Sequence, residues 1–134
     1  MLNEWLTKIK SNIPTDSPFG INLIVHKTNK RLHSSLDEIV AHKVPVVITS
    51  LGAVKDVVDA VHGYGGLVYH DVTNIHHARK AVDAGVDGLV AVCAGAGGHA
   101  GLVSPMALVP LLRQEFGKEI AVACAGVRCF DTCR

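Results

Sequence analysis

Short apolar runs that alternate with segments of helical periodicity constrain the fold of this chain more than any other feature. The runs are continuous rather than alternating, which is typical of parallel strands buried on both faces. They span Ile21–Val25, Val46–Thr49, Leu67–His70, Gly88–Val92 and Ile120–Cys124. Because helical segments separate them, the sequence predicts an α/β fold with a parallel sheet.

The segments between the runs carry apolar stripes at helical spacing. The stripes lie within residues 32–40, 54–61, 78–85 and 104–112, and residues 1–14 have the same periodicity. The last of these helices is expected to begin at Ser104-Pro105, a good N-cap followed by a good first-turn residue. Glycines such as Gly85 and Gly117 stand where a helix end favours a left-handed residue.

Two architectures fit this alternation, a doubly wound sheet and a (β/α)8 barrel. A complete barrel needs about 250 residues, and this chain has 134. Polar groups follow the carboxyl ends of four consecutive strands, at His26, Thr49-Ser50, His70-Asp71 and a glycine–histidine loop. A shared rim of this kind favours the barrel, since a doubly wound sheet uses the strand ends at its switch point. We therefore expect a single domain over residues 1–134, a partial barrel of about five parallel βα units.

Composition narrows the class of protein. The chain is 49% hydrophobic and 19% charged, so it can form a packed core. Its net charge is +1 and its cations are scattered, which does not suit binding to nucleic acid or to an anionic membrane. No apolar run reaches the roughly 18 residues of a membrane span, and the N-terminus lacks a signal peptide's apolar region. We expect a soluble, cytoplasmic protein.

Cysteine and histidine patterns do not indicate a metal site. Three of the four cysteines have the spacing C-x4-C-x3-C, which lacks the C-x2-C pair of common zinc sites. Cys93 and Cys124 fall inside apolar runs and are expected to be small buried residues, with all thiols reduced. The adjacent His76 and His77 cannot share one helix face. The four cysteines are Cys93, Cys124, Cys129 and Cys133.

The loop Gly95-Ala-Gly-Gly-His-Ala100 formally satisfies the dinucleotide pattern G-x-G-x-x-G/A. However, no helix opens within the glycines and no acidic residue ends the next strand, so a dinucleotide site is disfavoured. Glycines allow a backbone to approach a flat or phosphorylated ligand, and His99 has a side chain that can take up a proton near neutral pH. The alternative is a flexible turn whose histidine only meets solvent.

A family resemblance covers nearly residues 3 to 127. The segments FGINLIV, VPVVITSLG, GGLVYHDV, AVDAGVDGLVAVCAGAGGHAG and AVACAGV resemble, in this order, the nitronate monooxygenase family. The resemblance implies an FMN-binding TIM barrel that uses O2 to oxidise nitronates or nitroalkanes. By family order the five runs correspond to strands 3–7 of eight, so we expect a barrel truncated at both ends. Residues 128–134 match nothing in the family.

The resemblance also implies roles for individual residues. The catalytic residue would be His99, as the base that removes the proton next to the nitro group of a neutral nitroalkane. His70 stands where family members have other polar residues. No metal is expected. The implied cofactor-binding residues are Asn22, His70, Gly97, Gly98 and Gly126.

Two alternatives remain open. FMN-dependent enoyl reductases of fatty-acid synthesis share the glycine–histidine block, so the chain could be a relative of those enzymes instead. Alternatively, it is a non-catalytic remnant or a half-barrel binding module that pairs its open strand edges in a homodimer. The expected partners of the enzyme are a small nitronate or nitroalkane and O2, without nucleic acid or membrane.

Overall fold

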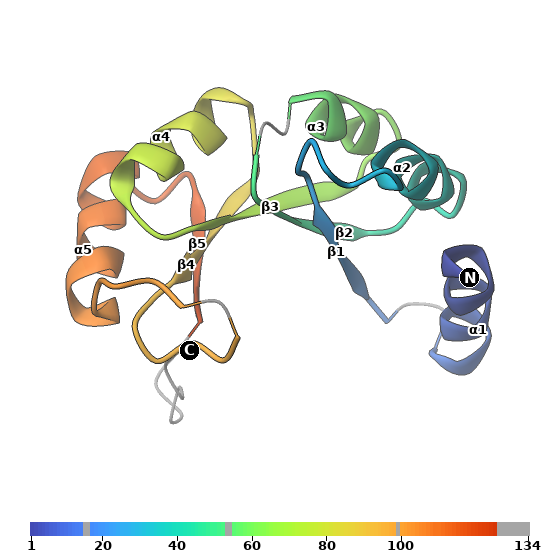
Figure 1. Cartoon of the computed structure of the whole chain (residues 1–134), viewed down its shortest axis with the longest axis horizontal. Coiled ribbons are helices and arrows are strands. Elements are labelled where there is room, and N and C mark those ends of the chain that lie inside the picture. Colours follow the sequence, from blue (N-terminus) through green and yellow to red (C-terminus); the bar gives the residue numbers. More distant parts are fainter. Residues whose placement is uncertain (15–16, 53–54, 99, 126–134) are drawn as a thin grey trace. The chain divides into compact units, whose positions relative to one another are not determined.

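The computed structural model describes residues 1–14, 17–52, 55–98 and 100–125, in which helices and strands alternate along the chain (Figure 1). The helices are α1 (Leu2–Asn12), α2 (Leu32–Ala41), α3 (Lys55–His62), α4 (Ile75–Asp83) and α5 (Pro105–Phe116). The strands are β1 (Gly20–Ile24), β2 (Val46–Ser50), β3 (Leu67–Val72), β4 (Gly88–Val92) and β5 (Ala121–Ala125). Each predicted apolar run is a strand whose bounds differ from the prediction by no more than two residues.

The five strands form one parallel sheet in the order β1-β2-β3-β4-β5. The register pairs Gly20 with Val46 at the start of β1 and Gly88 with Ala121 at the start of β4. A doubly wound sheet reverses its strand order at a switch point, and the order among these five strands contains no reversal. The prediction of an α/β partial barrel is therefore confirmed.

The chain divides into two compact units, residues 1–69 and 70–134, and β3 begins in the first and ends in the second. The expectation of one domain over residues 1–134 stays a prediction. The first unit buries the core residues Leu6, Leu23, Val25, Ile39, Val44, Val47, Val57, Val58, Val61 and Val68. The second buries Val72, Ala78, Ala81, Val86, Leu89, Ala91, Cys93, Leu108 and Leu112.

Helices cover one face of the strands in each unit. In the first unit α2 and α3 lie on one side of β1 and β2, and in the second α4 and α5 lie on one side of β4 and β5 (Figure 1). Leu23 is therefore buried in β1, whereas Asn22 and Ile24 are exposed on the open face. In β5 the alternate residues Ala121 and Ala123 are exposed. The expectation that every strand is buried on both faces is wrong for β1 and β5.

The helix ends follow the local sequence. Ser104 caps α5 as predicted, because its Oγ accepts a hydrogen bond from the Met106 N–H at 3.3 Å. Asn74 caps α4 in the same way, accepting from the His77 N–H at 2.9 Å, a cap that was not predicted. Gly117 ends α5 with a φ of 64°. No helix in the described part of the chain is long and apolar enough to cross a membrane.

Candidate functional site at the strand ends

Two backbone hydrogen bonds close the loop that follows β4. The Ala94 N–H donates to the Val103 carbonyl at 2.9 Å, and the Ala96 N–H donates to the Cys93 carbonyl at 3.1 Å. The first bond joins the beginning of the loop to its end, just before the cap of α5. The glycines of residues 95–98 therefore extend from a base that is held in place.

Three glycines of this loop are required by the fold itself. Gly95 and Gly98 have φ values of 96° and 84°, in the left-handed region that other residues rarely adopt. A Cβ on Gly101 would lie 2.1 Å from the carbonyl oxygen of Val92, which is part of the backbone and cannot give way. A glycine at these three positions is explained without any ligand.

Gly97 differs from these three glycines. Its φ lies outside the left-handed region, and a Cβ there would meet no heavy atom of the described residues within 4 Å. Gly98 faces open space by the same criterion. Neither conformation nor packing within the described chain thus explains glycine at 97. A bare backbone beside open space fits the flat or phosphorylated ligand expected here.

Two of the predicted site residues, His99 and Gly126, lie outside the described residues. Their roles stay predictions. The structure does place the two neighbours of His99 in the chain, since Gly98 and Ala100 are both exposed in the loop that follows β4. Gly98 and Ala100 follow the carboxyl end of β4, and ligands of such folds bind at the carboxyl ends of parallel strands.

In the first unit the open face of the strands carries a pair of polar side chains. The Ser50 Oγ, at the end of β2, donates to the Asn22 Oδ1 in β1 at 3.4 Å. The parallel register explains this contact, because it aligns Asn22 with Ile48, two residues before Ser50. The Asn22 carboxamide is exposed and so accessible to a ligand. Its predicted contact with FMN stays a prediction, and Ser50 is a partner that was not foreseen.

The side chain of Thr49, in contrast to that of Ser50, is buried in the core of the first unit. It alternates with Ser50 along β2, is fully buried on the helix-covered face, and its Oγ1 donates to the Tyr69 carbonyl at 3.1 Å. That bond links β2 to β3 inside the first unit. Of the polar pair that ends β2, Ser50 therefore belongs to the open face and Thr49 to the core.

His26 forms part of the turn that follows β1. Its Nδ1 accepts a hydrogen bond from the Thr28 N–H at 3.3 Å and lies 2.9 Å from the Thr28 Oγ1. The Asn29 Nδ2 supports the same turn by donating to the Ile24 carbonyl at 2.8 Å. Because Nδ1 accepts from a backbone N–H, the neutral ring carries its proton on Nε2.

His70 lies in β3 and is buried on the same face of the strand as Val68 and Val72. Burial lowers the pKa of His70 below its ordinary 6.5; Asp71 opposes this shift and His77 adds to it. Burial therefore favours the neutral form of the ring. Asn22, by contrast, is on the uncovered face of its strand. A cofactor-binding role for His70 stays a prediction.

The histidines of α4 make local contacts. The rings of His76 and His77 have centroids 6.2 Å apart and are tilted by 49°. The His77 Nδ1 lies 3.2 Å from the Thr73 Oγ1, within hydrogen-bonding distance.

Within residues 1–14, 17–52, 55–98 and 100–125, no group of three His, Cys, Asp or Glu side chains is placed to hold a metal ion.

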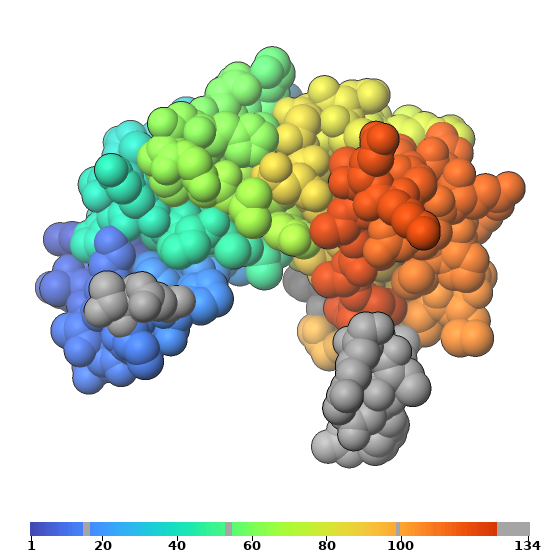
Figure 2. Space-filling view, turned by 180° about the vertical axis from the view of Figure 1, so that it is seen from behind, coloured from blue at the N-terminus to red at the C-terminus, as the bar shows by residue number. Residues whose placement is uncertain are grey.

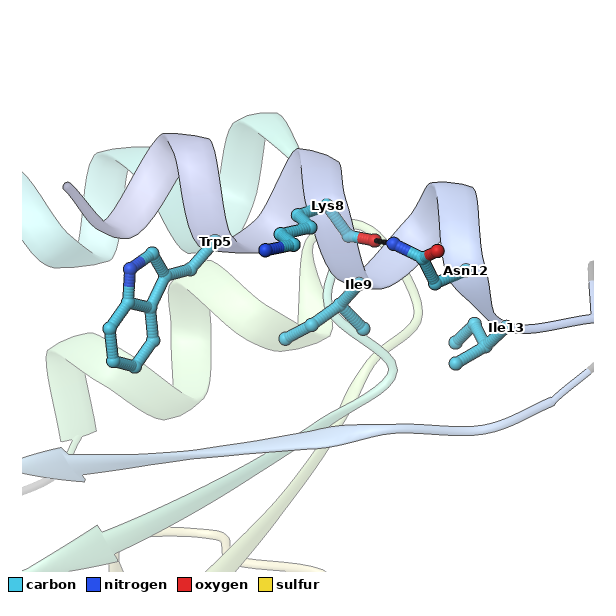
Figure 3. Close-up of a pocket in the computed structure, with 5 residues that line it drawn as sticks. All are labelled: Trp5, Lys8, Ile9, Asn12 and Ile13. Atoms are coloured by element: carbon cyan, nitrogen blue, oxygen red, sulfur yellow. Dashed lines mark hydrogen bonds between the residues drawn. The ribbon is translucent and has the colours of Figure 1, made fainter.

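An open hollow of about 500 Å³ runs along α1 (Figure 3). Its apolar lining is Trp5, Ile9 and Ile13, whose side chains point to the same side of the helix. Lys8 and Asn12 complete it, and the Asn12 Nδ2 donates to the Lys8 carbonyl at 2.7 Å. None of the described site residues Asn22, His70, Gly97 and Gly98 lines this hollow.

Comparison with curated proteins gives two relatives. Rv1533 of Mycobacterium tuberculosis, named as a monooxygenase, is 33% identical over 104 residues, which are 77% of this chain and 28% of that protein. A nitronate monooxygenase of Neurospora crassa is 38% identical over 85 residues, which are 56% of this chain and 22% of that protein. The chain thus spans less than a third of either relative's length. No family model matches it.

Solved structures support the fold. FabK from Thermotoga maritima superposes with a TM-score of 0.81 at 25% identity, covering 92% of this chain and 38% of that one. A nitroalkane oxidase from Streptomyces ansochromogenes gives a TM-score of 0.74 at 17% identity, covering 91% of this chain and 47% of that one. The second match is a similarity of fold alone. Both cover nearly the whole chain with less than half of the larger structure.

Proposed function

We propose, from the premise that the chain belongs to the nitronate monooxygenase family, that its glycine loop binds FMN for the oxidation of nitronates or nitroalkanes by O2. The observation that carries this proposal is Gly97, whose lack of a side chain is unexplained by the described part of the fold. Because the chain spans less than a third of its curated relatives, cofactor, substrate and O2 use are all proposals for it.

The proposed cofactor contacts of the glycine loop lie within the second unit. In the second unit, the bare backbone of Gly97 and Gly98 leaves room for a flat ring system beside its N–H groups. Within the first unit, the exposed carboxamide of Asn22 accepts from Ser50 through Oδ1 and can donate through Nδ2, and its contact with FMN stays a prediction. FMN, when bound, supplies the redox chemistry by accepting electrons from the nitronate and passing them to O2.

His99 is the proposed base. A neutral nitroalkane must lose a proton from the carbon beside the nitro group before it can give up electrons as a nitronate. An imidazole with an ordinary pKa near 6.5 can take that proton at neutral pH. A nitronate has already lost it, so the histidine would matter for one substrate and far less for the other.

The test compares turnover of a nitroalkane and of its nitronate by the chain supplied with FMN. His99→Ala is expected to lower nitroalkane turnover by about 100-fold, the scale of general base catalysis, and to lower nitronate turnover far less. His33→Ala is the control, since His33 is exposed on α2 in the other unit. Equal losses on both substrates would contradict the role of His99 as base.

Anaerobic reduction of FMN separates the proposed activity from the alternatives. Reduction by a nitronate supports the proposal, whereas reduction by NADH or NADPH alone would favour a relative of the enoyl reductases. If FMN binds and neither compound reduces it, the site is a binding module without this chemistry, and the proposed oxidation is contradicted.

A further inference from the structure

Two cysteine sulfur atoms from neighbouring strands lie close together in the second unit. The Cys93 Sγ, just after β4, is 3.8 Å from the Cys124 Sγ in β5. The register pairs Cys124 with Ala91, and the Cys93 N–H donates to the Ala125 carbonyl at 3.3 Å. The two cysteines are thus diagonal neighbours on the same face of adjacent strands.

The two thiols have unequal surroundings. Cys93 is fully buried, and its Sγ lies 3.5 Å from the Ala91 carbonyl oxygen, to which it can donate. Cys124 is partly exposed, on the last strand of the described sheet order. The space-filling view shows β5, in red, at the surface beside the orange atoms of α5 (Figure 2). A small oxidant can therefore reach Cys124 more readily than Cys93.

The difference in burial also separates their reactivity. Burial, together with the hydrogen bond and the charge interaction with Cys124, raises the pKa of the Cys93 thiol to about 11. Cys93 therefore remains protonated at neutral pH and is a poor initial nucleophile. Oxidation is expected to begin at Cys124, with Cys93 as the thiol that resolves it.

We propose that Cys93 and Cys124 form a reversible dithiol–disulfide site that is oxidised by hydrogen peroxide. In the first step the Cys124 sulfur attacks a peroxide oxygen, the O–O bond breaks, and a sulfenic acid and one water form. In the second, the Cys93 sulfur attacks the Cys124 sulfur, and the S–O bond breaks as a second water leaves. The two thiols lose two electrons and two protons in total, and the peroxide is reduced to two waters.

Bond formation would change the base of the glycine loop. A disulfide requires the sulfurs to be about 2.05 Å apart, so the two atoms must approach by well over an ångström from their separation of 3.8 Å. Cys93 is joined to the loop through its carbonyl, which accepts from the Ala96 N–H, and through Ala94, which bonds to Val103. Movement of Cys93 is thereby transmitted to both ends of the loop.

The test uses the full chain with Cys129→Ser and Cys133→Ser, so that Cys93 and Cys124 are the remaining thiols. Treatment with stoichiometric hydrogen peroxide is expected to remove both titratable thiols and two hydrogen masses. Peptide mapping should show an intramolecular link between the two cysteines that dithiothreitol reverses. Retention of both thiols, or oxidation of Cys124 without a link to Cys93, would overturn the proposal. No step requires FMN, so this result is independent of the proposed function.

A matched variant tests whether proximity is the cause. Cys124→Ser combined with Val122→Cys keeps two cysteines but moves one to a position in register with Leu89, four residues before Cys93. Val122 is partly exposed like Cys124. The shifted pair is expected not to form the internal link under conditions that fully link the original pair. Equal linking in both would show that the 3.8 Å contact is irrelevant and would contradict the proposal.

Discussion

The loops that follow β2 and β4 are alike in one glycine, and the β4 loop has a further glycine of a different kind. Each places a glycine against a strand-end carbonyl, since a Cβ on Gly52 would lie 2.0 Å from the Val25 oxygen and one on Gly101 would lie 2.1 Å from the Val92 oxygen. The β4 loop contains, in addition, Gly97, where an added Cβ would meet no heavy atom within 4 Å in the part of the chain that the structure describes. Close packing against the backbone explains why Gly52 and Gly101 are glycines. The glycine at 97 has no such explanation in the described residues and is consistent with a bound ligand.

This difference separates stability from binding within a single loop. A side chain at Gly101 would disturb the backbone that holds the loop on β4, whatever the loop binds. A Cβ at Gly97 would meet no described heavy atom within 4 Å, so a side chain there would matter if a ligand occupies that space. Substitutions at these positions are therefore expected to affect different measurements.

The largest expected effect on stability is that of Gly101→Ala. The added methyl group overlaps the Val92 carbonyl oxygen, so the free energy of unfolding should fall by about 3 kcal/mol. Urea unfolding followed by circular dichroism measures this change. A midpoint equal to that of the original chain would show that the loop is not packed on β4 as described.

A second pair of glycines provides a matched comparison with a smaller expected loss of stability. Gly98 and Gly65 have φ values of 84° and 85°, and for both a Cβ would meet no described heavy atom within 4 Å. Substitution by alanine at either position should cost about 1–2 kcal/mol of stability, from backbone strain alone. Gly98→Ala should also weaken FMN binding, whereas Gly65→Ala, after α3 in the other unit, should not. Equal affinities in the two variants would remove Gly98 from the site.

The smallest expected effect is a pH dependence from His70. The pKa of His70 is below 6.5 in the folded chain. Near that pH the unfolded chain therefore binds more protons than the folded chain does. The free energy of unfolding should therefore decrease from pH 7.5 to pH 5.5. His70→Gln should reduce this decrease, as measured by urea unfolding at both pH values. A variant with the full pH dependence would show that another group is responsible.

The strands were predictable because their signal is local. The run Gly88–Val92 is a strand with the predicted bounds, and Ser104-Pro105 begins a helix as its residue types require. Burial on both faces was wrong for β1 and β5 because it depends on where the helices lie. An apolar run does not say whether one or two layers of helix cover it.

The candidate site was predictable as a loop but not as a set of contacts. The pattern of residues 95–100 indicates a ligand loop, yet it cannot distinguish Gly97 from Gly98, since both are simply glycine in the sequence. The contacts between Asn22 and Ser50 and between Cys93 and Cys124 arise from strand register. Register is set by the packing of distant segments, which a single sequence does not show.

The most direct test of the central claim is a visible absorption titration with FMN, made in parallel on the original chain and on Gly97→Ala. We predict a saturable change in the flavin spectrum for the original chain and at least tenfold weaker binding for the variant. Urea unfolding of Gly97→Ala should be unchanged or slightly more resistant, because alanine restricts the unfolded chain. Absence of binding by the original chain, or equal affinity in both, would contradict the assignment of this loop to FMN.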